Sequence, residues 1–183
     1  MIQFFFFYGR MNNEVVGSMA EMISLMLNDF DKNDDESQVR LVLQVIPFFQ
    51  EIFATISQNY KKNKQLHNAS FTYLKSCSLC IKSVLNNEND SNTLATFINQ
   101  FFLSCLAPEC AEPITQLLIS ILTLDSAPND NLSAFVTPLN SYFQSPDLRK
   151  EFIKENGFSL CWTTYITESE NILIPLVFEN LEK

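Results

Sequence analysis

Apolar residues recur at helical spacing along nearly the whole chain, and this periodicity restricts the possible folds more than any other feature. In the first run, the side chains that share one helix face are Val15, Met19, Met22, Met26 and Phe30. Short polar stretches rich in Asp, Asn and Ser separate the later runs. The pattern predicts about nine helices, over residues 13–30, 38–62, 65–85, 92–106, 112–122, 132–143, 146–155, 158–166 and 170–182. No alternating strand pattern is longer than chance, so the predicted fold class is all-α.

The scarcity of glycine supports this fold class. Only 3 of the 183 residues are glycine, too few for a turn-dense β fold or a Gly-rich phosphate loop. Hydrophobic residues make up 46% of the chain and charged residues 18%, a balance typical of globular proteins. Because no shift in composition indicates a boundary, residues 11–183 are predicted to form a single domain. The first ten residues, MIQFFFFYGR, are interpreted as an extension, since their apolar stretch is too short for a signal peptide or a membrane span.

The helical pattern also predicts how the helices pack. The run over 38–62 is apolar over a broad arc, which indicates burial on more than one side. Pro47 lies within this run and is expected to kink it, because proline removes a backbone hydrogen bond. Helix pairs recur every ~35–45 residues, which is typical of stacked helical repeats.

The charge balance restricts the possible partners. The formal net charge is −9 and the isoelectric point is about 4.5, so the surface repels nucleic acid and anionic membranes. A basic protein or peptide is the partner that this charge favours. Five cysteines, an odd number, and the lack of a secretory start favour reduced thiols and a cytoplasmic or nuclear location.

Three motifs that could carry chemistry are weak. Cys77 and Cys80 form a CxxC within a predicted helix, without a second pair, and are interpreted as two buried small side chains. The acidic stretch that begins at Asp31 lacks the glycine and the final glutamate of a calcium loop. His67 is the only histidine and is interpreted as a surface residue. The sequence therefore predicts no enzymatic activity, no metal, no cofactor and no small-molecule ligand.

The last forty residues contain a short helix, Asn156-Gly157, a second helix, a polar break and a longer helix. Over residues 146–182 this order resembles an armadillo repeat. The matching positions are Arg149, Phe152, Ile153, Gly157, Leu160, Asn180 and Leu181. The resemblance implies a sharp turn between the first two helices, which glycine permits because it has no Cβ. Gly157 is therefore expected to have a positive φ.

A second resemblance lies nearer the N-terminus. Asp34 and Arg40, in DDESQVRLVLQVI, are similar to the turn and second helix of a HEAT repeat. In that family Asp and Arg of successive repeats form a ladder of charge-assisted hydrogen bonds. The two resemblances together imply a right-handed superhelical stack of about nine helices, an armadillo/HEAT-like solenoid.

The predicted function is protein–protein interaction, as a scaffold or adaptor that receives a peptide or a partner helix on its concave face. The armadillo resemblance implies that Asn180 contacts the partner's backbone; an asparagine that caps a helix end is the alternative. Trp162, the only tryptophan, is interpreted as core filling, with an exposed anchor for a partner as the alternative.

Two other functions remain open from the sequence. The chain could be a fragment of a larger scaffold, such as a BEACH-type or nuclear-transport-receptor-like solenoid, with a structural stacking role. It could also be a small all-α enzyme, for which a deep polar pocket around His67 would be the distinguishing feature.

Overall fold

The computed structural model describes residues 13–28, 35–56, 64–106, 108–124, 127–167 and 170–182, and every regular element in these ranges is a helix. The all-α prediction is therefore confirmed for this part of the chain. The α-helices of the first half are α1 (Asn13–Asn28), α2 (Asp35–Gln44), α3 (Ile46–Ile56), α4 (Lys64–Leu85), α5 (Glu88–Phe97) and α6 (Leu103–Cys105). Those of the second half are α7 (Ala111–Leu122), α8 (Asn129–Ser133), α9 (Val136–Phe143), α10 (Pro146–Lys154), α11 (Gly157–Ile166) and α12 (Leu173–Leu181). The π-helical segment η3 (Ile98–Phe102) joins α5 to α6, and the 3-10 turn η4 (Pro108–Cys110) leads into α7.

Several of these segments are continuous with one another. Helices α2 and α3 join through Val45, α5 continues through η3 into α6, and α8 joins α9 through two turn residues. Counted in this way, the described residues form nine helical runs, in agreement with the periodicity. The division at Val45 lies two residues before Pro47, where the sequence predicted a kink.

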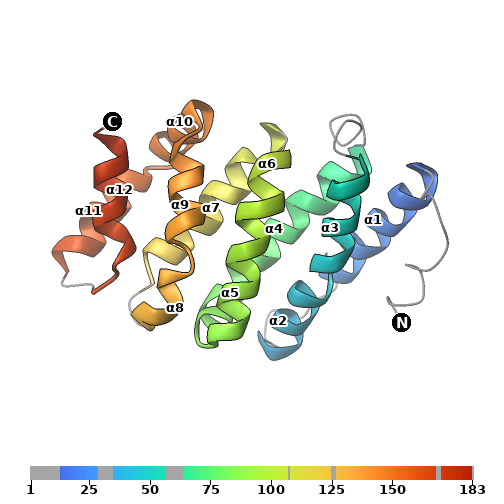
Figure 1. The fold of residues 1–183 in the computed structure, drawn as a ribbon, viewed down its shortest axis with the longest axis horizontal. Helices are drawn as coiled ribbons and strands as arrows, with labels where there is room; N and C mark the ends of the chain where they lie inside the picture. Colours follow the sequence, from blue (N-terminus) through green and yellow to red (C-terminus); the bar gives the residue numbers. More distant parts are fainter. Residues whose placement is uncertain are drawn as a thin grey trace.

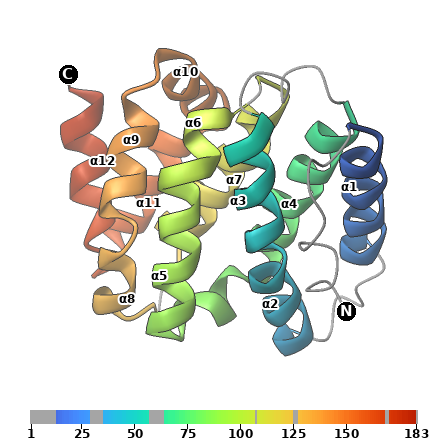
Figure 2. The same cartoon turned by 45° about the vertical axis from the view of Figure 1, so that its right-hand side comes forward.

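The helices lie in two layers that follow the chain along the long axis of the molecule (Figure 1). One layer contains α1, α4, α7 and α11, each packed on the next. The other contains α2 with α3, the α5–α6 run, α8 with α9, and α12, and the same order is visible after rotation in Figure 2. Helices α1 and α11 therefore lie at opposite ends of the molecule.

Aromatic side chains fill the space between the layers. Phe49, Tyr73, Phe97 and Phe102 are fully buried, and their ring centroids lie 5.0–6.4 Å apart. Tyr73 extends into this group from α4, the central helix of its layer. A core made of large interlocking rings fixes the spacing between layers, because aromatic pairs contribute packing energy beyond the area that they bury.

Buried polar side chains join the layers at an interval of 40 residues. Ser91, Asn131 and Asn171 lie near the start of α5, in α8 and just before α12, and all three are buried. Ser91 donates to the carbonyl of Val84 (3.1 Å) and Asn131 to that of Leu85 (2.7 Å), both at the end of α4. Asn171 donates to two carbonyls at the end of α7, Ile121 (3.2 Å) and Leu122 (3.0 Å). Each side chain satisfies carbonyls that a helix end leaves without an intrahelical partner.

The corner between α10 and α11 differs from the prediction for Gly157. No described glycine has a positive φ; Asn156 is the left-handed residue, with φ 57° and ψ 23°. Gly157 is the first residue of α11, and a Cβ there would lie 2.6 Å from Cε2 and Cζ of Phe152. Asparagine tolerates the left-handed region, whereas glycine is required next to it for space.

The expected Asp–Arg ladder stays a prediction, and the described residues show a different contact for Arg40. Its guanidinium lies 3.4 Å from the Glu36 carboxylate, one turn earlier on the same exposed helix face, and pairs with no following repeat within the described ranges. Asp34, the acidic stretch from Asp31 and the first ten residues lie outside the described residues.

Candidate functional site

Three asparagines occupy successive helices of one layer. Asn99 lies in η3, Asn140 in α9 and Asn180 in the last turn of α12. They are 41 and 40 residues apart in the sequence, and all three are half-buried. We call these three residues the asparagine row.

Hydrogen bonds from the row connect neighbouring helices. Ser141 Oγ donates to Asn99 Oδ1 at 2.7 Å, which joins α9 to η3. Asn180 Nδ2 donates to Asn140 Oδ1 at 2.8 Å, which joins α12 to α9, and also to the Leu176 carbonyl at 2.8 Å. Because the amide groups are held by these bonds, their remaining hydrogen-bonding groups have fixed positions.

The row retains unused hydrogen-bonding capacity. Asn99 and Asn140 accept through Oδ1, and no described residue accepts from the Nδ2 of either. A side-chain amide offers two donors and one acceptor oxygen, the same groups as a peptide backbone. Half-buried amides in a line can therefore pair with the backbone of an extended peptide.

A cleft of about 490 Å³ lies beside the row. Its walls come from α6, α9, α10 and the segment that opens α7, and Ser141 belongs both to the cleft and to the hydrogen bond with Asn99. The other lining residues are Leu103, Leu106, Pro108, Ala111, Ser145, Asp147, Leu148, Lys150 and Glu151. Apolar side chains thus alternate with hydroxyl and charged groups, and Asp147 and Lys150 pair with each other at 3.5 Å.

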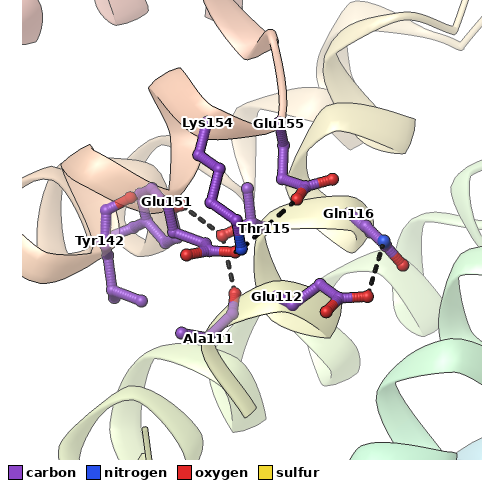
Figure 3. Close-up of polar contacts among 9 residues, drawn as sticks. Ala111, Glu112, Thr115, Gln116, Tyr142, Glu151, Lys154 and Glu155 are labelled. Atoms are coloured by element: carbon purple, nitrogen blue, oxygen red, sulfur yellow. Dashed lines mark hydrogen bonds and ion pairs between the residues drawn. The ribbon is translucent and has the colours of Figure 1, made fainter. Parts of the chain in front are cut away.

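A buried hydroxyl pair fixes the geometry of this cleft. Tyr142 of α9 donates to the carbonyl of Leu148 at the start of α10 (2.8 Å), and its hydroxyl lies 2.6 Å from that of Thr115 on α7. The Thr115 hydroxyl also donates to the Ala111 carbonyl at 2.7 Å, so each hydroxyl has a carbonyl acceptor and either of them can be the donor within the pair. Burial raises the pKa of Tyr142 far above its usual value, so the hydroxyl stays protonated. Figure 3 shows this pair beneath the charged groups of α10.

The charged groups above the hydroxyl pair interact with neighbouring side chains. Lys154 lies 2.8 Å from Glu151 and 4.0 Å from Glu155 (Figure 3), and the hydrogen bond that it donates to Glu151 raises the pKa of Lys154. Glu112 accepts from Gln116 at 3.2 Å. No carboxylate here is isolated in an apolar pocket, which is the environment that a general acid requires.

The structure separates the two residues predicted from the sequence. Asn180 faces α9 through its bond to Asn140, whereas Phe178, two residues earlier on α12, packs against Trp162 at 5.9 Å between ring centroids. Positions two apart on a helix point to nearly opposite sides. Core filling is wrong for Trp162, because its side chain is 50% exposed. Asn180 lies inside the last turn and bonds across helices, which is a different role from capping the helix end.

The other candidate residues contribute nothing to the cleft. His67 is mostly buried, with 12% of its side chain exposed and Nδ1 3.9 Å from Glu109 Oε2, so its assignment to the surface is wrong. Cys77 and Cys80 are buried in the middle of α4, as predicted, and burial raises the pKa of the Cys77 thiol. No cluster of three potential metal ligands occurs within the described ranges. None of the helices described here is long and apolar enough to cross a membrane.

Sequence reasoning missed Asn99, Asn140 and Ser141. The signal was present in the intervals of 41 and 40 residues between asparagines, but asparagine is frequent in this chain and the intervals alone do not stand out. No protein family, curated protein or solved structure matches this chain. The geometry of the described residues therefore carries the functional argument.

Proposed function

We propose that the chain is a protein-interaction module that binds an extended peptide segment along the asparagine row. The observation that carries the proposal is the alignment of half-buried amides on three successive helices, with Nδ2 of Asn99 and Asn140 still available. The adjoining cleft would receive a side chain of the peptide. The net charge of −9 favours a segment that contains Lys or Arg.

The proposed architecture is a right-handed, armadillo-like superhelical stack, with the layer that carries the row on its concave side. Three observations support it: the chain-ordered helices in two layers, the buried polar contacts every 40 residues, and the left-handed corner at Asn156. In such a stack each unit contacts only its neighbours, which produces a long binding surface.

A non-enzymatic role is part of this proposal, because the charged groups at the cleft pair with one another and the thiols described are buried. The proposed location is the cytoplasm or nucleus, where free thiols stay reduced. Of the cysteines whose side chains are described, Cys77, Cys80, Cys110 and Cys161 are all thiols outside any disulfide.

The proposal is tested by panning a phage library of random peptides against the protein. Asn99→Asp and Asn140→Asp keep the acceptor oxygens that bond within the structure and remove only the amide donors. We expect enriched peptides to contain Lys or Arg and to lose about tenfold or more in affinity for each variant. Asn86→Asp, at an exposed turn between α4 and α5, adds the same charge elsewhere and should bind normally.

The acidic substitutions make the test strict. The added charge alone would strengthen binding of a basic peptide, so a loss has to come from the missing donor. Enriched peptides that bind the row variants as tightly as the unmodified protein would refute the proposal, as would a failure to enrich any peptide.

A second candidate is a structural role within a larger helical scaffold, favoured by the exposed apolar side chains of α11. In this role a neighbouring unit would cover that helix. Light scattering after gel filtration distinguishes the two, because exposed stacking faces predict dimers or aggregates and a binding module predicts a monomer.

A further inference from the structure

Helix α11 exposes an apolar stripe at one end of the molecule. Phe158, Trp162 and Tyr165 are 49%, 50% and 51% exposed, and Ile166 is 60% exposed. Their spacing of 4, 7 and 8 residues from Phe158 places them on one face of the helix. Cys161, at the edge of this stripe, and Thr164, farther round the helix, are buried. The helix is thus apolar towards solvent as well as towards α12.

The aromatic rings of this stripe form a connected platform. Phe178 of α12 lies beneath them, with centroid distances of 5.7 Å to Phe158, 5.9 Å to Trp162 and 5.8 Å to Tyr165. Trp162 and Tyr165 are 6.1 Å apart. Because each ring contacts its neighbours, the ring positions are already fixed before a partner binds. Large aromatic side chains with few rotatable bonds are the residues that dominate binding energy at interfaces.

The α11–α12 region that carries the platform is acidic in sequence. From Glu155 to Glu182 the sequence contains five glutamates and no lysine or arginine. Glu170, Glu179 and Glu182 are exposed, and Glu182 directly follows α12, four residues after Phe178. Electron-rich ring faces and carboxylates both attract cations, so this surface favours Lys and Arg over Asp and Glu.

A second copy of the chain fits this surface poorly. Among the described residues, a second exposed apolar face lies on α1, at the far end of the molecule (Figure 1), and consists of Met22, Leu25 and Met26. Helix α1 contains Glu14 and Glu21 and no basic residue. Head-to-tail pairing of the two ends would therefore oppose carboxylates, and like charges at an interface disfavour association.

We propose that the outer face of α11, with Phe178 beneath it, docks an amphipathic α-helix of a partner protein whose apolar stripe is flanked by Lys and Arg. This surface is distinct from the asparagine row, which lies on the other side of α12. The docking proposal does not depend on peptide binding at the row.

Trp162 provides a direct test, because it is the only tryptophan in the chain. The probe is a synthetic peptide of about 18 residues, or five helical turns, with leucine at helical spacing, Lys and Arg on both flanks, and no tryptophan. Its control has Glu in place of every Lys and Arg. The basic peptide is expected to shift the Trp162 emission to shorter wavelength and to bind in the micromolar range, more weakly at high salt. The acidic peptide should cause no shift.

Variants locate the binding site by calorimetry. Trp162→Ala and Tyr165→Ala are expected to weaken the basic peptide about tenfold or more, since both side chains are exposed and their loss leaves the core intact. Leu25→Ala on α1 removes an equally exposed leucine at the other end and should leave affinity unchanged. Circular dichroism checks that each variant remains folded.

Three results would overturn the proposal. The first is the absence of an emission shift with the basic peptide. The second is equal binding of the acidic peptide. The third is a dimer in sedimentation experiments that Trp162→Ala abolishes, which would mean that a second copy covers the face.

Discussion

Gly157→Ala tests whether space, rather than backbone conformation, requires glycine at the corner between α10 and α11. The added Cβ would lie 2.6 Å from two ring atoms of Phe152, well inside van der Waals contact. The ring cannot move aside easily, because Phe152 is fully buried and packs against Phe143 and Tyr142 at centroid distances of 5.1 and 6.4 Å. Overpacking of this kind costs about 1–3 kcal/mol.

Gly17→Ala is the matched control. Gly17 lies within α1, and its added Cβ would meet only the side-chain amide of Gln65, an exposed and flexible group. Replacing a helical glycine by alanine should then stabilise by about 0.5–1 kcal/mol. Urea unfolding followed by circular dichroism measures the change in the free energy of unfolding for each variant. The dependence of this free energy on urea concentration should be unchanged if the unfolded states are comparable. In a chain of this size, a loss of 1 kcal/mol lowers Tm by about 2–4 °C.

A double substitution identifies the contact responsible. In the Phe152→Leu background the ring is gone, so Gly157→Ala should cost much less than it does alone, with a coupling of about 1 kcal/mol or more. The explanation by the Phe152 ring is refuted if Gly157→Ala changes the free energy of unfolding no more unfavourably than Gly17→Ala does. It is also refuted if Gly157→Ala lowers the free energy of unfolding equally in the unmodified and the Phe152→Leu backgrounds.

Further substitutions test other parts of the structure. Asn156→Gly should be neutral within about 0.5 kcal/mol and Asn156→Ala should destabilise by about 1 kcal/mol in urea unfolding, because only the alanine resists a φ of 57°. Tyr142→Phe should cost about 1–3 kcal/mol in the same assay, since it leaves the Leu148 carbonyl without its donor; an unchanged midpoint would contradict the hydroxyl pair. Burial raises the pKa of Cys161 to about 12 from a usual value near 9, so the folded thiol stays protonated while the unfolded thiol ionises. Stability should accordingly fall as the pH rises above about 9, and Cys161→Ala should show a smaller fall in thermal melts between pH 8 and about 11.

The helices could be predicted from the sequence because helical periodicity is a local signal. The described part of the run predicted over 38–62, residues 38–56, shows this well: apolar spacing predicted the helices, and Pro47 predicted the break near Val45. The helices and the break between them each depend on residues that lie within a few helical turns of one another.

The left-handed residue at the corner between α10 and α11 could not be predicted from the local sequence. Asparagine and glycine can both adopt the left-handed region, and the sequence favours the glycine. In the structure Asn156 adopts it, and Gly157 instead makes room for the Phe152 ring, whose position depends on the packing of α10 against α9 and α7.

The candidate site depends even more on packing. The intervals between Asn99, Asn140 and Asn180 are visible in the sequence, but their hydrogen bonds exist only because three helices lie side by side in one layer. Trp162 was misplaced for a related reason. Its exposure depends on whether another helix covers α11, and among the described residues none does.

The contact of Asn171 with the end of α7 has a consequence for unfolding. This side chain holds two carbonyls that lie 49 and 50 residues earlier in the sequence. When α12 frays, the last turn of α7 loses its cap, although the four helices α8 to α11 lie between them in the chain. Asn131 links α8 to the end of α4 in the same way. Local opening should therefore spread from unit to unit through these caps, so that amide exchange at the end of α7 rises together with exchange in α12.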